Sequence, residues 1–172
     1  ADLITIQGNK SNKSLVIMNF TGCDGFRIYK GCHYVNIKYL TIAGNNTSNT
    51  FGFACLGWAH CNNLVVKNFY NGFYVFSGGR MDAQSCTITL NTFHGIAVAD
   101  CGAVWIKDCT VSANTQCGFN AYGCSKVTIL SGNSIINNSA WGIMSDAQSR
   151  IDCGVSTNSI SGNTSGAILA QG

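Results

Sequence analysis

A glycine followed by an apolar residue recurs along this chain about every two dozen residues, and no other feature restricts the fold as strongly. From Gly72 onward the intervals are 23, 23, 24 and 24 residues, and the two earlier intervals are 27 and 20. A unit this short cannot bury its own apolar face, so it must stack on copies of itself. The openings are Gly25-Phe26, Gly52-Phe53, Gly72-Phe73, Gly95-Ile96, Gly118-Phe119, Gly142-Ile143 and Gly166-Ala167.

Within one unit, such as residues 95–117, apolar residues alternate with a period of two in short runs, which is typical of strands. The chain has no glutamate and lacks the three- and four-residue spacing of helices. Three strands and three turns per unit predict an all-β fold, a right-handed parallel β-helix of about seven coils in one domain, residues 1–172. A β-sandwich is the alternative, but the hairpin signal Asn-Gly occurs once, at Asn71-Gly72.

A second marker, an apolar residue followed three places later by asparagine, keeps the same phase. It recurs as Ile42/Asn45, Ile88/Asn91, Val111/Asn114, Ile135/Asn138 and Ile160/Asn163. Asparagine tolerates left-handed backbone angles, and its amide can bond to the coils above and below. We therefore expect an asparagine ladder with a structural role at one turn.

Composition agrees with a solenoid that carries neutral polar groups on its surface. Hydrophobic residues make up 46% of the chain and charged residues only 10%, well below the usual quarter. Proline is absent, which suits strands that pair on both sides, because a missing N–H would leave a neighbouring carbonyl unpaired. The abundant Asn, Ser, Thr and Gly also suit a surface that contacts carbohydrate.

Charge and hydropathy disfavour several partners. The net charge of +3 comes from scattered lysines and arginines, so no nucleic-acid binding is expected. No apolar stretch approaches a membrane span, and the N-terminus lacks the features of a signal peptide. Both ends lie within strand-like sequence and supply no polar cap, so we expect an excerpt of a longer chain or ends covered by other chains.

The ten cysteines fall at repeat positions rather than in a disulfide framework. Cys101 and Cys124 share one offset from their glycines, and Cys86 and Cys109 share another. We expect small thiols that fill the core, while a bond between stacked cysteines stays possible by distance. With no Cys-x-x-Cys pair and three histidines, we expect neither a zinc site nor another metal or cofactor.

Residues at equal offsets from the glycine should stack in columns. The first offset (Phe26, Phe53, Phe73, Ile96, Phe119, Ile143) and the third (Ile28, Cys55, Val75, Val98, Ala121) are predicted to face the core. The fourth should face outward or into the turn, and it includes Tyr29, Phe76 and Tyr122. Outward aromatic residues can stack on sugar rings or pack against another subunit.

The eighth offset is mostly cationic: His33, His60, Arg80, Ala103, Lys126 and Arg150. Three interpretations stay open: a turn that accepts any polar residue, a strip that binds carboxylates or phosphates of an acidic polysaccharide, or pairing with acids of a partner chain. The second of these makes Arg80, Lys126 and Arg150 candidate carbohydrate-binding residues, together with Tyr29, Phe76 and Tyr122.

The tenth offset holds Asp82, Trp105, Thr128 and Asp152. Asp82 and Asp152 should form local ion pairs with the arginines two residues before them. Hydrolysis of a polysaccharide needs two carboxylates about 5 to 10 Å apart, but three coils separate these two by roughly 14 Å. No Ser or Cys nucleophile motif occurs, so the catalytic residue stays unassigned, with Asp82 as the one candidate.

The repeats Gly72-Phe73-Tyr74-Val75-Phe76-Ser77-Gly78-Gly79 and Gly118-Phe119-Asn120-Ala121-Tyr122-Gly123-Cys124-Ser125 resemble those of bacteriophage tailspike and tail-fibre proteins, within the pectate-lyase-like β-helices. The resemblance implies a homotrimer, a place in the extracellular virion tail and binding of bacterial surface polysaccharide. It also implies, for many relatives, depolymerisation by Asp and Glu residues, which the absence of glutamate disfavours here.

Three hypotheses follow. The first is a phage tailspike or tail-fibre segment that recognises bacterial surface polysaccharide, as part of a depolymerase or without catalysis. The second is a free-standing polysaccharide lyase, epimerase or hydrolase. The third is a structural spacer or adhesin stalk.

Overall fold

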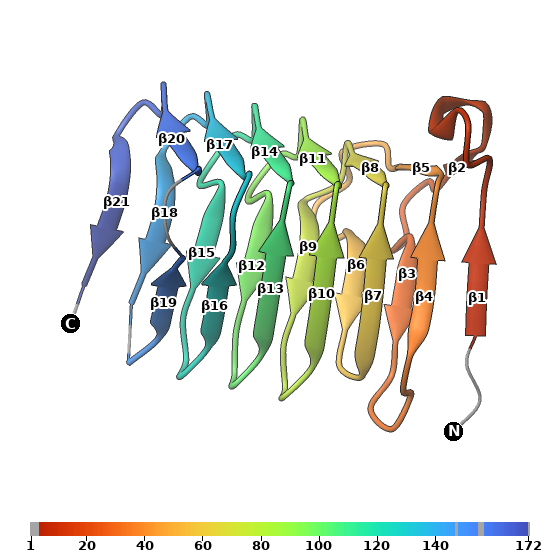
Figure 1. Cartoon of the computed structure of the whole chain (residues 1–172), viewed down its shortest axis with the longest axis horizontal. Coiled ribbons are helices and arrows are strands. Elements are labelled where there is room, and N and C mark those ends of the chain that lie inside the picture. The colour runs from red at the N-terminus through yellow and green to blue at the C-terminus, as the bar shows by residue number, and fades with distance from the viewer. Residues whose placement is uncertain (1–3, 147, 155–156, 172) are drawn as a thin grey trace.

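The computed structural model describes residues 4–146, 148–154 and 157–171, and these form a rod with the two chain ends at opposite ends (Figure 1). The predicted right-handed parallel β-helix is confirmed. Each coil contributes one strand to each of three parallel sheets, and each sheet contains seven strands. Every strand pairs with the equivalent strands of the neighbouring coils, on both sides except at the two ends of each sheet, so residues at one position of the repeat stack along the rod.

The first sheet, here called sheet A, consists of β1 (Ile4–Gln7), β4 (Val35–Lys38), β7 (Trp58–Asn62), β10 (Arg80–Gln84), β13 (Ala103–Lys107), β16 (Lys126–Ile129) and β19 (Arg150–Cys153). Sheet B consists of β2 (Ile17–Asn19), β5 (Thr41–Ala43), β8 (Val65–Lys67), β11 (Thr87–Thr89), β14 (Thr110–Ser112), β17 (Ser134–Ile136) and β20 (Ser159–Ser161). Sheet C consists of β3 (Phe26–Ile28), β6 (Phe51–Cys55), β9 (Asn71–Val75), β12 (Ile96–Val98), β15 (Phe119–Ala121), β18 (Trp141–Ser145) and β21 (Gly166–Ala170).

One short helical turn, η1 (Lys13–Leu15), precedes β2. The side chain of Asn12 accepts a hydrogen bond from the Ser14 backbone N–H and caps this turn. Across the residues that the structure describes, no helix has the length and apolar character needed to cross a membrane.

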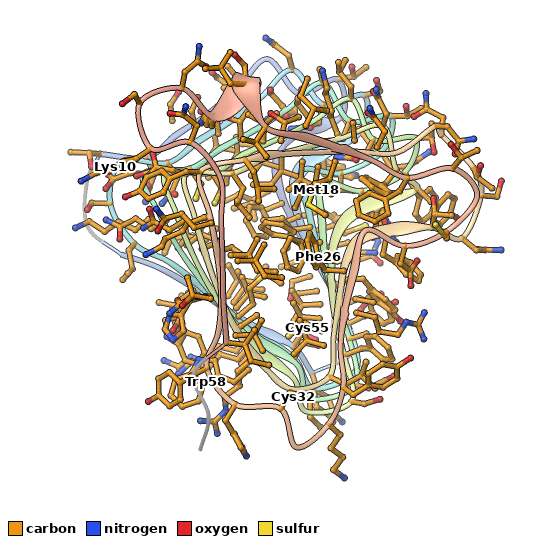
Figure 2. All side chains as sticks on the ribbon, turned by 90° about the vertical axis from the view of Figure 1, so that its right-hand side faces the viewer. Lys10, Met18, Phe26, Cys32, Cys55 and Trp58 are labelled. Atoms are coloured by element: carbon orange, nitrogen blue, oxygen red, sulfur yellow. The ribbon has the colours of Figure 1, made fainter. Side chains whose placement is uncertain are left out.

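The core is made of the predicted columns. The register of sheet C places Phe53, Phe73, Ile96, Phe119 and Ile143 at one level of successive coils, and none of them is exposed. The rings of Phe53 and Phe73 meet edge to face at 5.4 Å. The third-offset column is buried beside it. Figure 2, a view along the rod, shows Met18, Phe26 and Cys55 pointing into this interior.

The asparagine ladder is also present, although its backbone differs from the prediction. The Asn114 side chain accepts from the Asn91 amide at 2.9 Å and donates to Asn138 at 2.9 Å, and Asn138 donates to Asn163. The left-handed residue is the one before each asparagine: Leu90, Ala113, Asn137 and Gly162 have φ between 52° and 66°. The ladder asparagines therefore satisfy buried backbone groups, and their neighbours make the turn.

Half of the cysteine prediction is wrong. Cys86 and Cys109 are buried, with the Cys86 backbone N–H 3.4 Å from the Cys109 sulfur. Cys101 and Cys124, however, are exposed in the turns between sheets C and A, where both have left-handed φ values. All ten cysteines are free in the described structure.

Candidate functional site

The outer face of sheet A carries two columns of polar and aromatic side chains. One column runs Trp58, Arg80, Ala103, Lys126 and Arg150. The next runs Asn36, His60, Asp82, Trp105, Thr128 and Asp152. Both columns face away from the core, because the intervening residues, such as Met81 and Val104, are fully buried.

The predicted cationic column is therefore correct from Arg80 onward and wrong for the two histidines. Two residues separate β6 from β7, whereas four separate β9 from β10. His60 therefore lies two places further along its strand than predicted, beside Asp82, and Trp58 lies beside Arg80 in the cationic column. Six residues separate β3 from β4, and this longer connection leaves His33 in the turn.

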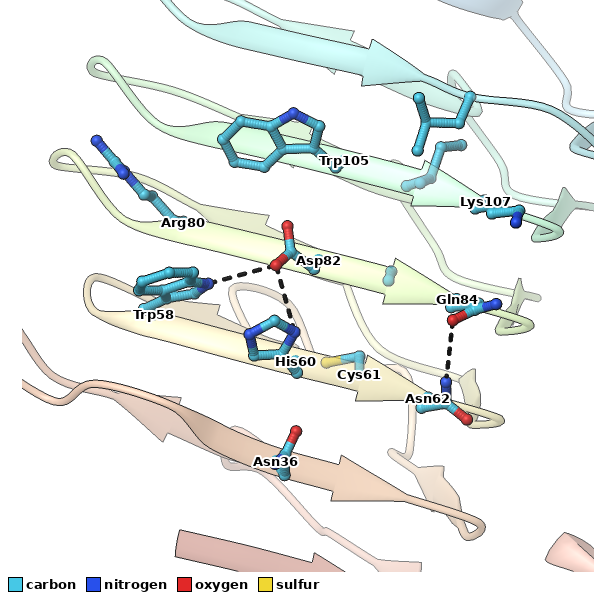
Figure 3. A pocket seen from close by; sticks show the side chains of 13 residues that line it. Asn36, Trp58, His60, Cys61, Asn62, Arg80, Asp82, Gln84, Trp105 and Lys107 are labelled. Atoms are coloured by element: carbon cyan, nitrogen blue, oxygen red, sulfur yellow. Dashed lines mark hydrogen bonds and ion pairs between the residues drawn. The ribbon is translucent and has the colours of Figure 1, made fainter. Parts of the chain in front are cut away.

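Asp82 is the centre of this face. Its Oδ2 lies 3.3 Å from Nδ1 of His60 and accepts a hydrogen bond of 3.4 Å from the Trp58 indole N–H (Figure 3). Trp105 occupies the equivalent position in the next coil, so Asp82 lies between His60 and Trp105. The side chains of His60 and Asp82 are about one third exposed, which leaves the pair accessible from solvent.

Aromatic rings enclose the pair on one side. The Tyr34 ring packs against Trp58 with centroids 4.3 Å apart and stacks on the His60 imidazole at 5.7 Å. Tyr34 adopts a left-handed φ of 56°, which aims its ring from the β3–β4 connection toward β7. Nε2 of His60 is buried without a hydrogen-bond partner. A donor that reached this atom would therefore gain a hydrogen bond that the protein alone does not provide.

A groove of about 580 Å³ lies over these residues. Strands β4, β7, β10 and β13 supply most of its lining. Trp58, His60, Asp82 and Trp105 occupy its middle, and Asn62, Gln84 and Lys107 line the end toward sheet B, with the Asn62 amide 3.4 Å from Gln84 (Figure 3). The groove thus combines aromatic rings with amide, carboxylate and cationic groups, as sites for small polar ligands do.

The three candidate cations divide into two groups. Arg150 donates to Asp152 at 2.6 Å, as predicted, and the Lys126 ammonium lies 4.0 Å from the same carboxylate. The predicted pair between Arg80 and Asp82 does not form, because Asp82 faces His60 and Trp58 in the preceding coil instead. Among the described residues, Arg80 makes no ion pair, and it lines the groove.

The three candidate aromatic residues also divide. Phe76 and Tyr122 contact a shared neighbour on the outer face of sheet C: Phe76 stacks on Tyr74 at 4.5 Å, and the Tyr122 hydroxyl donates to the Tyr74 hydroxyl at 3.4 Å. Burial raises the pKa of Tyr122, with the Tyr74 contact as the next cause. Tyr29 lies apart, 62% exposed in the β3–β4 connection. Sheets A and C therefore present two separate aromatic surfaces.

The acids of sheet A are too far apart to act as a pair. Three coil-to-coil steps separate Asp82 from Asp152, through Trp105 and Thr128, or roughly 14 Å at the strand spacing. The partner that lies close to Asp82 is His60. No group of three or more His, Cys, Asp or Glu side chains in the described ranges could hold a metal ion.

Sequence analysis did not identify Trp58 or Tyr34, and it did not connect His60 with Asp82. The available signal was the short interval of 20 residues after Gly52, which indicates a shortened turn. Nothing in the sequence shows which of the three turns is short, so the shift of β7 could not be assigned.

Comparison with known proteins agrees with the geometry. A family model described as the right-handed beta helix region matches residues 4–172. No match was found among curated proteins or among solved structures. The match covers nearly the whole chain, and the three parallel sheets are those expected of such a fold. The chain therefore belongs to the right-handed β-helix family.

Proposed function

We propose that this β-helix binds polysaccharide on the outer face of sheet A, in the groove centred on Asp82. One observation carries the proposal: Trp58, His60 and Trp105 surround a carboxylate in an open groove of about 580 Å³. Indole rings pack against the C–H faces of sugars, and the surrounding polar groups bond to hydroxyls.

The polar groups of the groove suit hydroxyl ligands. Asp82 accepts hydrogen bonds, and the amides of Asn62 and Gln84 can both donate and accept. The strands of sheet A continue beyond the groove on both sides, with Thr5 before it and Thr128 after it. An extended chain that lies along the rod would therefore meet further polar side chains at each coil, about 4.8 Å apart.

The test is a glycan array of bacterial surface polysaccharides, followed by titration calorimetry on the polysaccharides that bind. Trp58→Ala and Trp105→Ala should each weaken binding at least tenfold, because each removes a stacking surface. Tyr29→Ala, an exposed aromatic residue outside this groove, measures the effect of losing any surface ring. Equal affinity in both tryptophan variants and the wild type would exclude the groove as the binding site.

A second candidate function is cleavage or epimerisation of the bound polysaccharide, and the His60–Asp82 contact favours it. His60 and Asp82 lie within 3.3 Å of each other in the groove, and a carboxylate–imidazole pair can transfer a proton to or from a bound sugar. The separation of Asp82 from Asp152 disfavours hydrolysis by two carboxylates. Assays for new reducing ends and for unsaturated uronates distinguish this candidate from binding alone, with His60→Gln as the inactive variant.

The resemblance to tailspike and tail-fibre proteins extends the proposal to a homotrimer in an extracellular virion tail that recognises a bacterial host. Phe76 and Tyr122, with Tyr74, then supply either a second sugar-binding surface or a contact between subunits. Light scattering on the purified chain tests the trimer, and Tyr122→Ala distinguishes the two roles: it lowers glycan affinity in the first and dissociates the trimer in the second.

A further inference from the structure

A second hollow adjoins the groove at the turns between sheets C and A. Its volume is about 620 Å³, and Trp58 and Arg80 line both it and the groove. Figure 2 labels Cys32 and Trp58 at this corner of the cross-section, well away from Lys10. The residues that line the hollow are Lys30, Gly31, His33, Leu56, Gly57, Trp58, Ser77, Gly78 and Arg80.

The hollow has a simple geometric cause. The β6–β7 turn contains two residues, Leu56 and Gly57, and lies between a connection of six residues and one of four. The shorter turn is recessed, so the longer turns on each side form the walls. Gly57 makes the floor: a Cβ atom there would lie 2.5 Å from the Tyr29 carbonyl oxygen and 2.6 Å from that of Cys32, so only glycine fits.

Two cationic side chains, Lys30 and Arg80, line the hollow together with the imidazole of His33, and among the described residues no aspartate does so. Neither Lys30 nor Arg80 makes an ion pair among the described residues, in contrast to Lys126 and Arg150, which share Asp152. Cations held near one another repel unless an anion lies between them, and a recessed site with backbone walls strengthens their attraction for that anion.

We infer that this hollow binds an anionic group, a carboxylate, sulfate or phosphate, through Lys30, His33 and Arg80. Where the proposed function holds, the anion is a substituent of the polysaccharide whose sugar ring packs on Trp58, because Trp58 forms the boundary between the two hollows. The anion site itself does not depend on the proposed function, since its lining contains cations whether or not a sugar occupies the groove.

The first experiment uses inorganic phosphate and inorganic sulfate. Each is titrated into the ¹⁵N-labelled chain at constant ionic strength, and the indole N–H of Trp58 and the backbone amides of Gly31 and Gly78 are followed by NMR. We expect saturable shifts of these signals, with affinity at least fivefold weaker in Lys30→Gln and Arg80→Gln. Lys10→Gln, which changes the net charge equally at a distant position, should behave as the wild type. Shifts that do not saturate, or that are the same in all variants, overturn the inference.

The second experiment uses matched polysaccharides: dextran sulfate against dextran, and polygalacturonate against its methyl ester. We expect an anionic member to bind at least tenfold more tightly than its neutral partner, and this advantage should disappear in Arg80→Gln. Neutral binding with no anionic advantage would contradict the inference and leave the proposed function in place. Saturable binding of inorganic anions with no polysaccharide binding would contradict the proposed function and leave the anion site in place.

Discussion

Nδ1 of His60 lies 3.3 Å from the Asp82 carboxylate, although 22 residues separate the two in the sequence. The contact exists because β7 and β10 pair in parallel with His60 opposite Asp82. Residues that lie nearly one repeat apart in the sequence therefore become neighbours on one face of the β-helix. The residues of the proposed site come together in this way, from successive coils.

Asp82→Asn should weaken polysaccharide binding about tenfold and leave stability nearly unchanged. The carboxylate accepts from Trp58 and faces His60, so an amide loses the negative charge that orients both. Because the pair is partly exposed, its contribution to folding is small, at most about 1 kcal/mol. Calorimetry and thermal unfolding measure the two effects. Asp108→Asn, an exposed acid elsewhere, is the control, and unchanged affinity in Asp82→Asn would refute the role of the carboxylate.

Asn114→Ala should lower the free energy of unfolding by about 3 kcal/mol, since buried partners in Asn91 and Asn138 lose their hydrogen bonds. Asn114 is fully buried, so water cannot replace these bonds without opening the turn. Urea unfolding gives the value. Gln116→Ala, on the exposed side of the same turn, should change it by less than about 0.5 kcal/mol. Equal effects of the two substitutions would show that the ladder is not a source of stability.

His94 should make the fold acid-sensitive. Burial lowers its pKa from 6.5 to about 4. Its Nδ1 accepts from the Cys117 backbone N–H, and its Nε2 lies 3.1 Å from the Asn120 amide. Between pH 6.5 and about 4, His94 is therefore protonated in the unfolded chain but neutral in the folded chain. Stability from this group is complete above pH 6.5 and decreases as the pH falls toward 4, by about 3 kcal/mol in total.

Urea unfolding at pH 7, 6 and 5 measures this effect as the difference between the wild type and His94→Gln. The wild-type free energy of unfolding should fall more steeply with acid than that of the variant, in which no imidazole is present to be protonated. Parallel curves for the two proteins would mean that other groups cause the acid sensitivity.

The ten thiols should divide into two classes of five in a labelling experiment. Cys23, Cys32, Cys101, Cys124 and Cys153 are exposed and should react with a thiol reagent in the native protein. The buried five should react only after unfolding, because the packed core keeps the reagent away from them. For Cys55, burial also raises the pKa to about 12, so hardly any reactive thiolate forms there. Mass spectrometry of labelled peptides identifies each site. Native labelling of Cys86 or Cys109 would contradict the packing of the core.

The sequence alone predicted the fold and the core columns because the repeat is regular where the columns are longest. Between Gly72 and Gly118, two equal intervals of 23 residues place Phe73, Ile96 and Phe119 on one another, and the structure agrees. Backbone pairing between neighbouring coils enforces this register. A count of residues from each glycine is then equivalent to a spatial position.

The site could be predicted only in part, because it lies where the repeat is irregular. Arg80-x-Asp82 and Arg150-x-Asp152 are the same pattern, yet Asp152 bonds to its own arginine and Asp82 does not. The difference arises in the neighbouring coil, which places Trp58 and His60 beside Asp82 but Lys126 and Thr128 beside Asp152. Two residues missing from one turn determine this, and the sequence does not show which turn is short.

Because strands pair only at equivalent positions of neighbouring coils, the number of coils can change without changing the groove. Each strand pairs only with the equivalent strands of the coils before and after it, and the groove occupies a few consecutive coils near the middle. Duplication or loss of a whole coil beyond β17 would therefore lengthen or shorten the molecule and leave Asp82 and its surroundings intact. The length of the rod and the ligand that it binds can therefore evolve independently. A change of one or two residues within a turn, such as the turn before β7, instead shifts which side chains lie side by side on the outer face.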